Sequence, residues 1–132
     1  MTFSFIPLGA SSAIPAFGRH PASHLVEHFD RYFLLDAGEG IQLRLQHHRI
    51  RLRRLDAIFI SHLHGDHVLG LLPLINSYAL NRRKRPLYIY GPKPIQRFIE
   101  QQLECTQSHL PFSIHFSEFE AGSPTVARLK IG

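Results

Sequence analysis

Cysteine is almost absent from this 132-residue sequence, in which Cys105 stands alone. A disulfide framework within the chain is therefore excluded, no disulfide partner is expected, and a cysteine-rich zinc module is excluded as well. A reducing, cytoplasmic location is the simplest expectation, and any metal site must use nitrogen and oxygen ligands. Long apolar runs are also missing, since none approaches the roughly 18 to 20 residues of a membrane span. Because the first residues lack a basic segment and a small-residue cleavage site, we expect an unprocessed chain without membrane contact.

The composition that remains fits one folded unit with a positive charge. Hydrophobic residues make up 44% of the chain, enough to bury a core, and the length is too short for two complete domains. Fifteen lysines and arginines against ten acidic residues give a formal charge of +5, which suits a polyanionic partner. Basic residues gather in two runs, 49–54 and 82–85. Each run either contacts phosphates or lies in a solvated loop beside a helix end, and the sequence leaves both open.

Apolar periodicity predicts an alternation of strands and helices. Strands are expected over 2–8, 23–28, 31–36, 56–61, 87–90, 112–119 and 125–131, and a hairpin is expected to join 23–28 to 31–36. Helices are expected over 39–48 and 68–80, and a third helix after Gly91 and Pro92. The apolar face of this third helix would carry Ile95, Phe98, Ile99 and Leu103. This order predicts an α/β layered domain. Functional residues are then expected in loops at the carboxyl ends of the strands.

Three histidines and one aspartate crowd into six positions directly after the predicted buried strand 56–61. They are His62, His64, Asp66 and His67. Neutral imidazole and carboxylate favour zinc or another borderline divalent ion, and a site without thiolates fits a catalytic metal better than a closed structural one. A solvated histidine loop is the alternative, which this density of metal-binding side chains disfavours.

The segment 62–67 resembles the HxHxDH motif of the metallo-β-lactamase superfamily. Three other segments are similar to ribonuclease Z, the family of endonucleases that trim the 3′ end of precursor tRNA: LGASSAIP at 8–15, DAGEGIQ at 36–42 and IYGP at 89–92. The resemblance covers roughly residues 1 to 105. HxHxDH indicates the superfamily without selecting a substrate. The resemblance to ribonuclease Z in particular depends on the other three segments.

The resemblance implies a metallo-β-lactamase-like four-layer αββα sandwich, an α/β fold of which residues 1–132 form about the amino-terminal half, as one incomplete domain. His109 and His115 are the only later histidines, and no aspartate follows Asp66. The family's third histidine, bridging aspartate and last histidine are therefore missing. We expect the isolated chain to be inactive, to belong to a larger enzyme, and to associate as a homodimer, as is common in the family.

The implied activity is that of a zinc-dependent phosphodiesterase that removes 3′ trailers from precursor tRNA through a metal-activated water. The complete site would hold two Zn²⁺ ions, with Mn²⁺ as a substitute. By position, the resemblance implies that His62 and His64 bind the first ion and that Asp66 and His67 bind the second. Asp66 would also handle the proton as a catalytic residue.

Three further positions enter through the resemblance. Asp36 either orients a ligand histidine or caps the next helix. Pro15 and Arg19 match the loop that the family uses near the tRNA 3′ end, although Phe17 and His20 replace its lysine and asparagine. Two alternatives stay open: another hydrolase of the superfamily that acts on a small phosphodiester or thioester, and a non-catalytic fragment that binds RNA or a partner.

Overall fold

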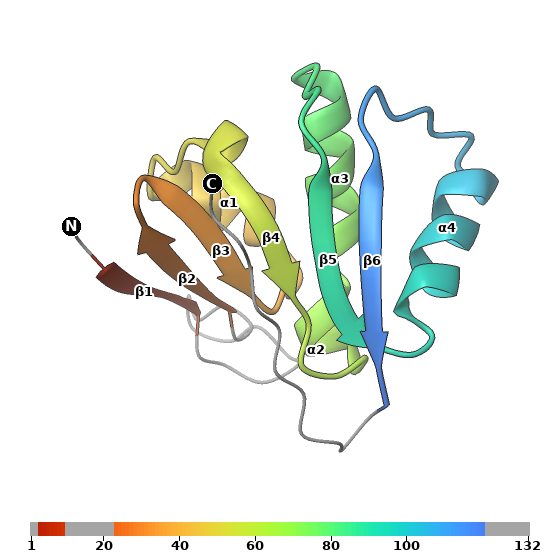
Figure 1. Cartoon of the computed structure of the whole chain (residues 1–132), viewed down its shortest axis with the longest axis horizontal. Helices are drawn as coiled ribbons and strands as arrows, with labels where there is room; N and C mark the ends of the chain where they lie inside the picture. The colour runs from red at the N-terminus through yellow and green to blue at the C-terminus, as the bar shows by residue number, and fades with distance from the viewer. Residues whose placement is uncertain (1–2, 10–22, 121–132) are drawn as a thin grey trace.

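The computed structural model describes residues 3–9 and 23–120. Strands and helices alternate along the described chain (Figure 1), in the order β1 (Phe3–Gly9), β2 (Ser23–His28), β3 (Arg31–Leu35), α1 (Ile41–His47), the 3₁₀ turn η1 (Leu52–Arg54), β4 (Leu55–Phe59), α2 (Gly65–Val68), α3 (Leu71–Leu80), β5 (Leu87–Pro92), α4 (Ile95–Cys105) and β6 (Ile114–Phe119). The predicted strand at 125–131 lies outside the described residues. The predicted α/β alternation is confirmed for the rest.

The described strands form one sheet in sequence order, β1-β2-β3-β4-β5-β6. The pairs β1/β2 and β2/β3 are antiparallel, whereas β3/β4, β4/β5 and β5/β6 are parallel. Parallel neighbours need crossover connections, which α1, the pair α2 and α3, and α4 supply in turn. The carboxyl ends of β3 to β6 therefore meet at one edge of the sheet, the lower edge in Figure 1.

The hairpin between β2 and β3 closes at the two positions that the sequence predicts. Phe29 and Asp30 have φ angles of 51° and 59°. Two consecutive positive φ angles are typical of a type I′ turn, whose twist matches that of the flanking strands. His28 and Arg31, the residues that flank the turn, pair with each other. The hairpin fixes the register of β3 and therefore the position of Asp36, the residue that follows this strand.

One face of the sheet is buried under the helices. Behind the sheet in Figure 1, α1 and α3 pack against the strands, and residues such as Leu34, Ile58 and Ile89 are fully buried between the layers. The predicted apolar face of α4 is confirmed, with Ile95 and Ile99 buried and Phe98 and Leu103 packed against the core. No helix in 23–120 is long and apolar enough to span a membrane.

The predicted helix over 68–80 needs a correction. Val68 ends the short helix α2, and α3 begins only at Leu71. The chain turns at Gly70, whose backbone packs directly against Gly38. The break separates α2, and the predicted metal ligands on it, from the long buried helix α3.

The opposite face of the sheet carries exposed aromatic side chains. Phe3 and Phe5 are 69% and 54% exposed and alternate along β1 with residues that point toward the helices. Tyr88 on β5 is exposed on the same side and pairs in register with Ala57 of β4. Among the described residues, this face of the sheet therefore presents exposed aromatic surface. Cys105, exposed at the end of α4, is a helix-end residue and not a core residue.

Candidate metal centre

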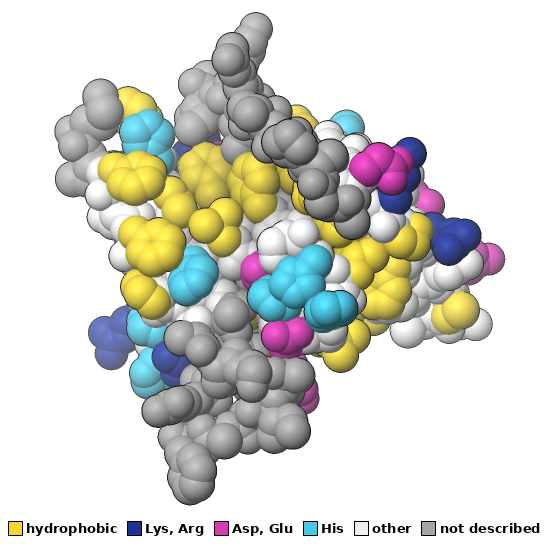
Figure 2. All heavy atoms as spheres, turned by 90° about the horizontal axis from the view of Figure 1, so that it is seen from below, with side chains coloured by type: hydrophobic (Ala, Val, Ile, Leu, Met, Phe, Trp, Pro, Cys, Tyr) yellow, Lys and Arg dark blue, Asp and Glu magenta, His cyan; other side chains and the backbone are white. Residues whose placement is uncertain are grey.

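The predicted metal-binding residues lie at the carboxyl edge of the sheet. Asp36 directly follows β3, and Ser61 to His67 run from the end of β4 into α2. Figure 2, which views the molecule onto this edge, shows histidine and acidic side chains gathered near its middle. Segments 25 residues apart in the sequence thus meet at neighbouring strand ends, as the predicted topology requires.

Asp36 is held in an unusual backbone conformation. Its φ angle is 64°, in the left-handed region that aspartate tolerates better than most residues. Its N–H donates to the carbonyl oxygen of Phe59 at 2.7 Å, which extends the β3/β4 pairing by one residue. The carboxylate consequently projects across the end of β4 toward the histidine cluster.

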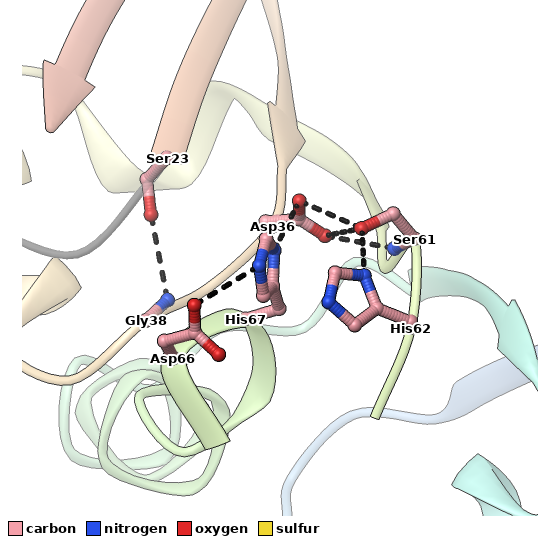
Figure 3. Close-up of polar contacts among 7 residues, drawn as sticks. All are labelled: Ser23, Asp36, Gly38, Ser61, His62, Asp66 and His67. Carbon is pink, nitrogen blue, oxygen red and sulfur yellow. Dashed lines mark hydrogen bonds and ion pairs between the residues drawn. The ribbon is translucent and has the colours of Figure 1, made fainter. Parts of the chain in front are cut away.

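The Asp36 carboxylate collects hydrogen bonds from two sides (Figure 3). On one side, the Ser61 backbone N–H donates to Oδ1 at 2.7 Å, and the Ser61 hydroxyl lies 2.9 and 3.0 Å from the two oxygens. On the other, Nδ1 of His67 lies 2.8 Å from Oδ2. The alternative role of a helix cap is not what the structure shows, because the N-cap of α1 is Gly40 and no side chain caps it.

These contacts select the proton position on both rings. The Ser61 hydroxyl has one proton and directs it to Asp36, so the His62 Nδ1 at 2.9 Å donates to the Ser61 oxygen. His67 likewise donates from Nδ1 to Asp36. In the neutral rings, both Nε2 atoms then carry the free lone pair that a metal needs.

Three side chains converge closely enough to hold one cation. One ligand atom from each of His62, Asp66 and His67 lies within 4.8 Å of the others. Nε2 of His67 lies only 3.2 Å from an Asp66 carboxylate oxygen, and the rings of His62 and His67 are 3.7 Å apart between centroids. Ligand atoms that lie this close to one another can share one cation. The donor set of two imidazoles and one carboxylate therefore fits a divalent metal.

His64 lies beside this group without joining it. It is the exposed N-cap residue of α2, and its ring is 4.8 Å from that of His62. The resemblance to ribonuclease Z implied that His62 binds one ion and that Asp66 and His67 bind another, whereas in the structure these three side chains lie together. Whether His64 also binds metal stays a prediction.

A close backbone contact locks the Asp36 loop onto α2. Ala37 donates its N–H to the His67 carbonyl at 2.8 Å, and Gly70 donates to the Ala37 carbonyl at 2.9 Å. A Cβ at Gly70 would lie 1.9 Å from the Gly38 carbonyl oxygen, so only glycine fits. The loop and the helix therefore hold the carboxylate and His67 in a fixed relation.

Sequence reasoning missed Ser61, which links Asp36 to His62. Its position directly before the first histidine was the available signal, but a serine at a strand end is too common to single out. Pro15 and Arg19, predicted near the substrate, lie outside the described residues, and their roles stay predictions.

Solved structures share this fold. The short form of human tRNase Z superposes with a TM-score of 0.81 at 33% identity, over 86% of this chain and 44% of that chain. The metallo-β-lactamase fold protein YhfI from Bacillus subtilis superposes with a TM-score of 0.71 at 24% identity, over 93% of this chain and 47% of that one. The chain is thus a metallo-β-lactamase fold protein, which confirms the predicted fold class.

The family model described as "Anti-Pycsar protein Apyc1" matches residues 3–116, and the chain belongs to this family. It is also 37% identical over 119 residues to a protein named Ribonuclease Z from Porphyromonas gingivalis, and 39% identical over 119 residues to one from Bacteroides thetaiotaomicron. The resemblance to ribonuclease Z is thereby confirmed. Each alignment covers 90% of this chain but only 39% and 38% of the relatives, so the chain spans about two fifths of their length.

Proposed function

We propose that this chain forms the amino-terminal, metal-binding portion of a ribonuclease Z-like endonuclease that removes 3′ trailers from precursor tRNA. The convergence of His62, Asp66 and His67 within 4.8 Å is the observation that carries the proposal. The similarity to proteins named Ribonuclease Z supports the substrate. A divalent cation held by these residues would supply Lewis acidity to a water nucleophile and to the phosphodiester.

The chain's own residues orient the ligands and handle protons. Asp36 and Ser61 fix the rings of His67 and His62 by hydrogen bonds to Nδ1, so that both Nε2 atoms point into the centre. Asp66, with an oxygen 3.2 Å from the His67 Nε2, acts as a ligand and as the group that moves the proton. His64 adds a ligand on the exposed side.

The proposal extends to zinc as the metal, with two ions in the complete site and Mn²⁺ as a substitute. It also includes a homodimer that acts in the cytoplasm. Exposed Phe3 and Phe5 on the open sheet face support self-association, because apolar surface of this kind is stabilised by contact with another surface. The isolated 132-residue chain is expected to bind metal but to cleave little, since it spans only about two fifths of the length of its ribonuclease Z relatives.

Metal binding is tested by titrating zinc into the chelator-stripped 132-residue chain. We expect saturable binding that His62→Ala weakens by about 100-fold, because one of three converging ligands is lost. His109→Ala, which removes an exposed histidine outside the cluster, is the matched control and should bind zinc as the parent chain does. Equal affinity of the His62 variant and the control would contradict the metal centre.

Nuclease function is tested in a chimera in which residues 3–116 replace the matching segment of the Porphyromonas gingivalis ribonuclease Z. We expect cleavage of precursor tRNA at the 3′ trailer, lost on His62→Ala and retained on His109→Ala. A chimera that binds zinc and leaves precursor tRNA uncut would refute the endonuclease and leave the metal centre standing.

A second candidate is a hydrolase of the same fold that acts on a small phosphodiester. The description of the matching family model names an anti-Pycsar protein and not a ribonuclease, so a tRNA substrate does not follow from that family. Hydrolysis of bis-p-nitrophenyl phosphate by the chimera, without cleavage of precursor tRNA, would select this candidate.

A further inference from the structure

A basic cavity lies at the edge of the sheet opposite the metal centre. Residues just before β4 and just before β5 surround it, so it sits at the amino-terminal ends of these strands, with the length of β4 between it and the histidine cluster. Its volume is about 680 Å³, within the range of roughly 300 to 1,000 Å³ typical of small-molecule sites. It is lined by Arg51, Leu52, Arg53, Tyr78, Asn81, Arg83, Lys84 and Arg85.

The fold brings the two basic runs of the sequence together in this cavity. Among the described residues, Arg51, Arg53 and Lys84 form no ion pair, whereas Arg85 pairs with Asp56. Asp56 in turn is shared with Arg31 at 3.5 Å. Most of the positive charge around the cavity is therefore not neutralised by the described part of the chain.

Arg83 adds a buried cation to the lining of the cavity. The residue is only 7% exposed, and its guanidinium donates to the backbone carbonyls of Arg85 and Pro86, each at 2.9 Å. Its charge lies 4.8 Å from the centre of the Tyr78 ring, which stabilises it in part. The alternative of a solvated loop charge is wrong for this arginine. Burial lowers the pKa of Arg83 and raises that of Tyr78, because a charged form of either group loses hydration.

Two buried polar atoms of the cavity lining have no hydrogen-bond partner among the described residues. They are Nη1 of Arg83 and the hydroxyl of Tyr78, a residue 1% exposed. Leaving a buried donor unsatisfied costs about 1–3 kcal/mol, more for a charged group. A buried guanidinium that has carbonyl partners but no carboxylate is best stabilised by an anion.

We propose that this cavity binds a phosphate group at the end of a small molecule, such as a nucleoside monophosphate, or free phosphate itself. Arginine and lysine side chains match phosphate oxygens, and the buried guanidinium of Arg83 adds positive charge to the cavity lining. A cavity, unlike a flat surface, favours a terminal group that protrudes into it. A phosphodiester inside an RNA strand carries a sugar on each side and cannot enter as far. The cavity also has an apolar part, Leu52 and the Tyr78 ring, for the organic portion of the ligand.

The test is calorimetric titration of the 132-residue chain with inorganic phosphate and with adenosine 5′-monophosphate. EDTA in the buffer removes any metal from the histidine cluster, so the outcome does not depend on the proposed nuclease. We expect saturable binding that the double variant Arg53→Gln/Lys84→Gln weakens at least about tenfold, since two charge-assisted contacts are lost. The matched control, Arg49→Gln/Arg82→Gln, removes two exposed charges from the same runs outside the cavity and should stay within about twofold of the parent.

Three outcomes would overturn the proposal. Absence of saturable binding would remove the site. An equal loss in the control variant would show attraction by net charge alone. A single-stranded RNA without terminal phosphates that displaces the mononucleotide and binds more tightly would assign the cavity to the RNA backbone. If inorganic phosphate and the mononucleotide bind equally well, free phosphate is the ligand, whereas tighter binding of the nucleotide assigns the site to a phosphorylated organic molecule.

Discussion

The two edges of the sheet differ in how fully their polar groups are hydrogen-bonded. At the carboxyl edge, Asp36, Ser61, His62 and His67 are joined by hydrogen bonds of 2.7 to 3.0 Å. At the amino edge, an arginine and a tyrosine of the cavity lining each have a buried polar atom without a hydrogen-bond partner in residues 3–9 and 23–120. The first edge is thus organised before any ligand arrives, whereas the second is left with a charge that the described chain does not neutralise. Preorganisation suits a site that holds a metal in fixed geometry, and an uncompensated cation suits capture of an anion.

The contact between Gly70 and Gly38 is the strongest test of the preorganised edge. Gly70→Ala should lower the free energy of unfolding by about 3 kcal/mol, because the new Cβ cannot fit beside the Gly38 carbonyl and the Asp36 loop must move. Thermal or denaturant unfolding measures the loss. The control Gly40→Ala, where a Cβ meets nothing within 4 Å but φ is 80°, should cost only about 1 kcal/mol. A smaller loss for Gly70 than for Gly40 would mean that the loop is not locked onto α2.

Asp36→Asn tests the hydrogen bonds without changing the size of the side chain. The carboxylate accepts from the Ser61 N–H, the Ser61 hydroxyl and His67 Nδ1, all of them donors, and an amide offers only one accepting oxygen. Zinc affinity should fall about 10- to 100-fold. Asp30→Asn, at a carboxylate 82% exposed, should leave zinc affinity unchanged. Unchanged affinity in the Asp36 variant would show that the ligands are not positioned by this carboxylate.

Tyr78→Phe addresses the other edge. Removing a buried hydroxyl that has no partner should leave the phosphate-free protein equally stable or raise its free energy of unfolding by up to about 1 kcal/mol. The control Tyr88→Phe, at an exposed tyrosine, should change stability little. A clear destabilisation by Tyr78→Phe would show that the hydroxyl is satisfied in the free protein, and the contrast between the two edges would fail.

Local sequence signals were sufficient for most elements. The hairpin turn at Phe29 and Asp30, the strand before His62 and the apolar face of α4 depend on residues close together in the chain, so periodicity and turn chemistry predicted them. The break between α2 and α3 was missed, because it arises from the approach of Gly38, more than 30 residues away, to Gly70. The apolar pattern over 68–80 contains no signal for a contact with a residue so distant in the sequence.

The sequence alone determined that a histidine and aspartate cluster follows a buried strand, because both features are local. It could not decide which of these ligands converge, or that Ser61 links Asp36 to His62, because those contacts join the ends of β3 and β4 through space. Only the tertiary structure united the basic runs and buried Arg83 in their midst. The physical reason is that burial and partner choice depend on packing between distant segments, whereas strand and helix patterns depend on neighbours along the chain.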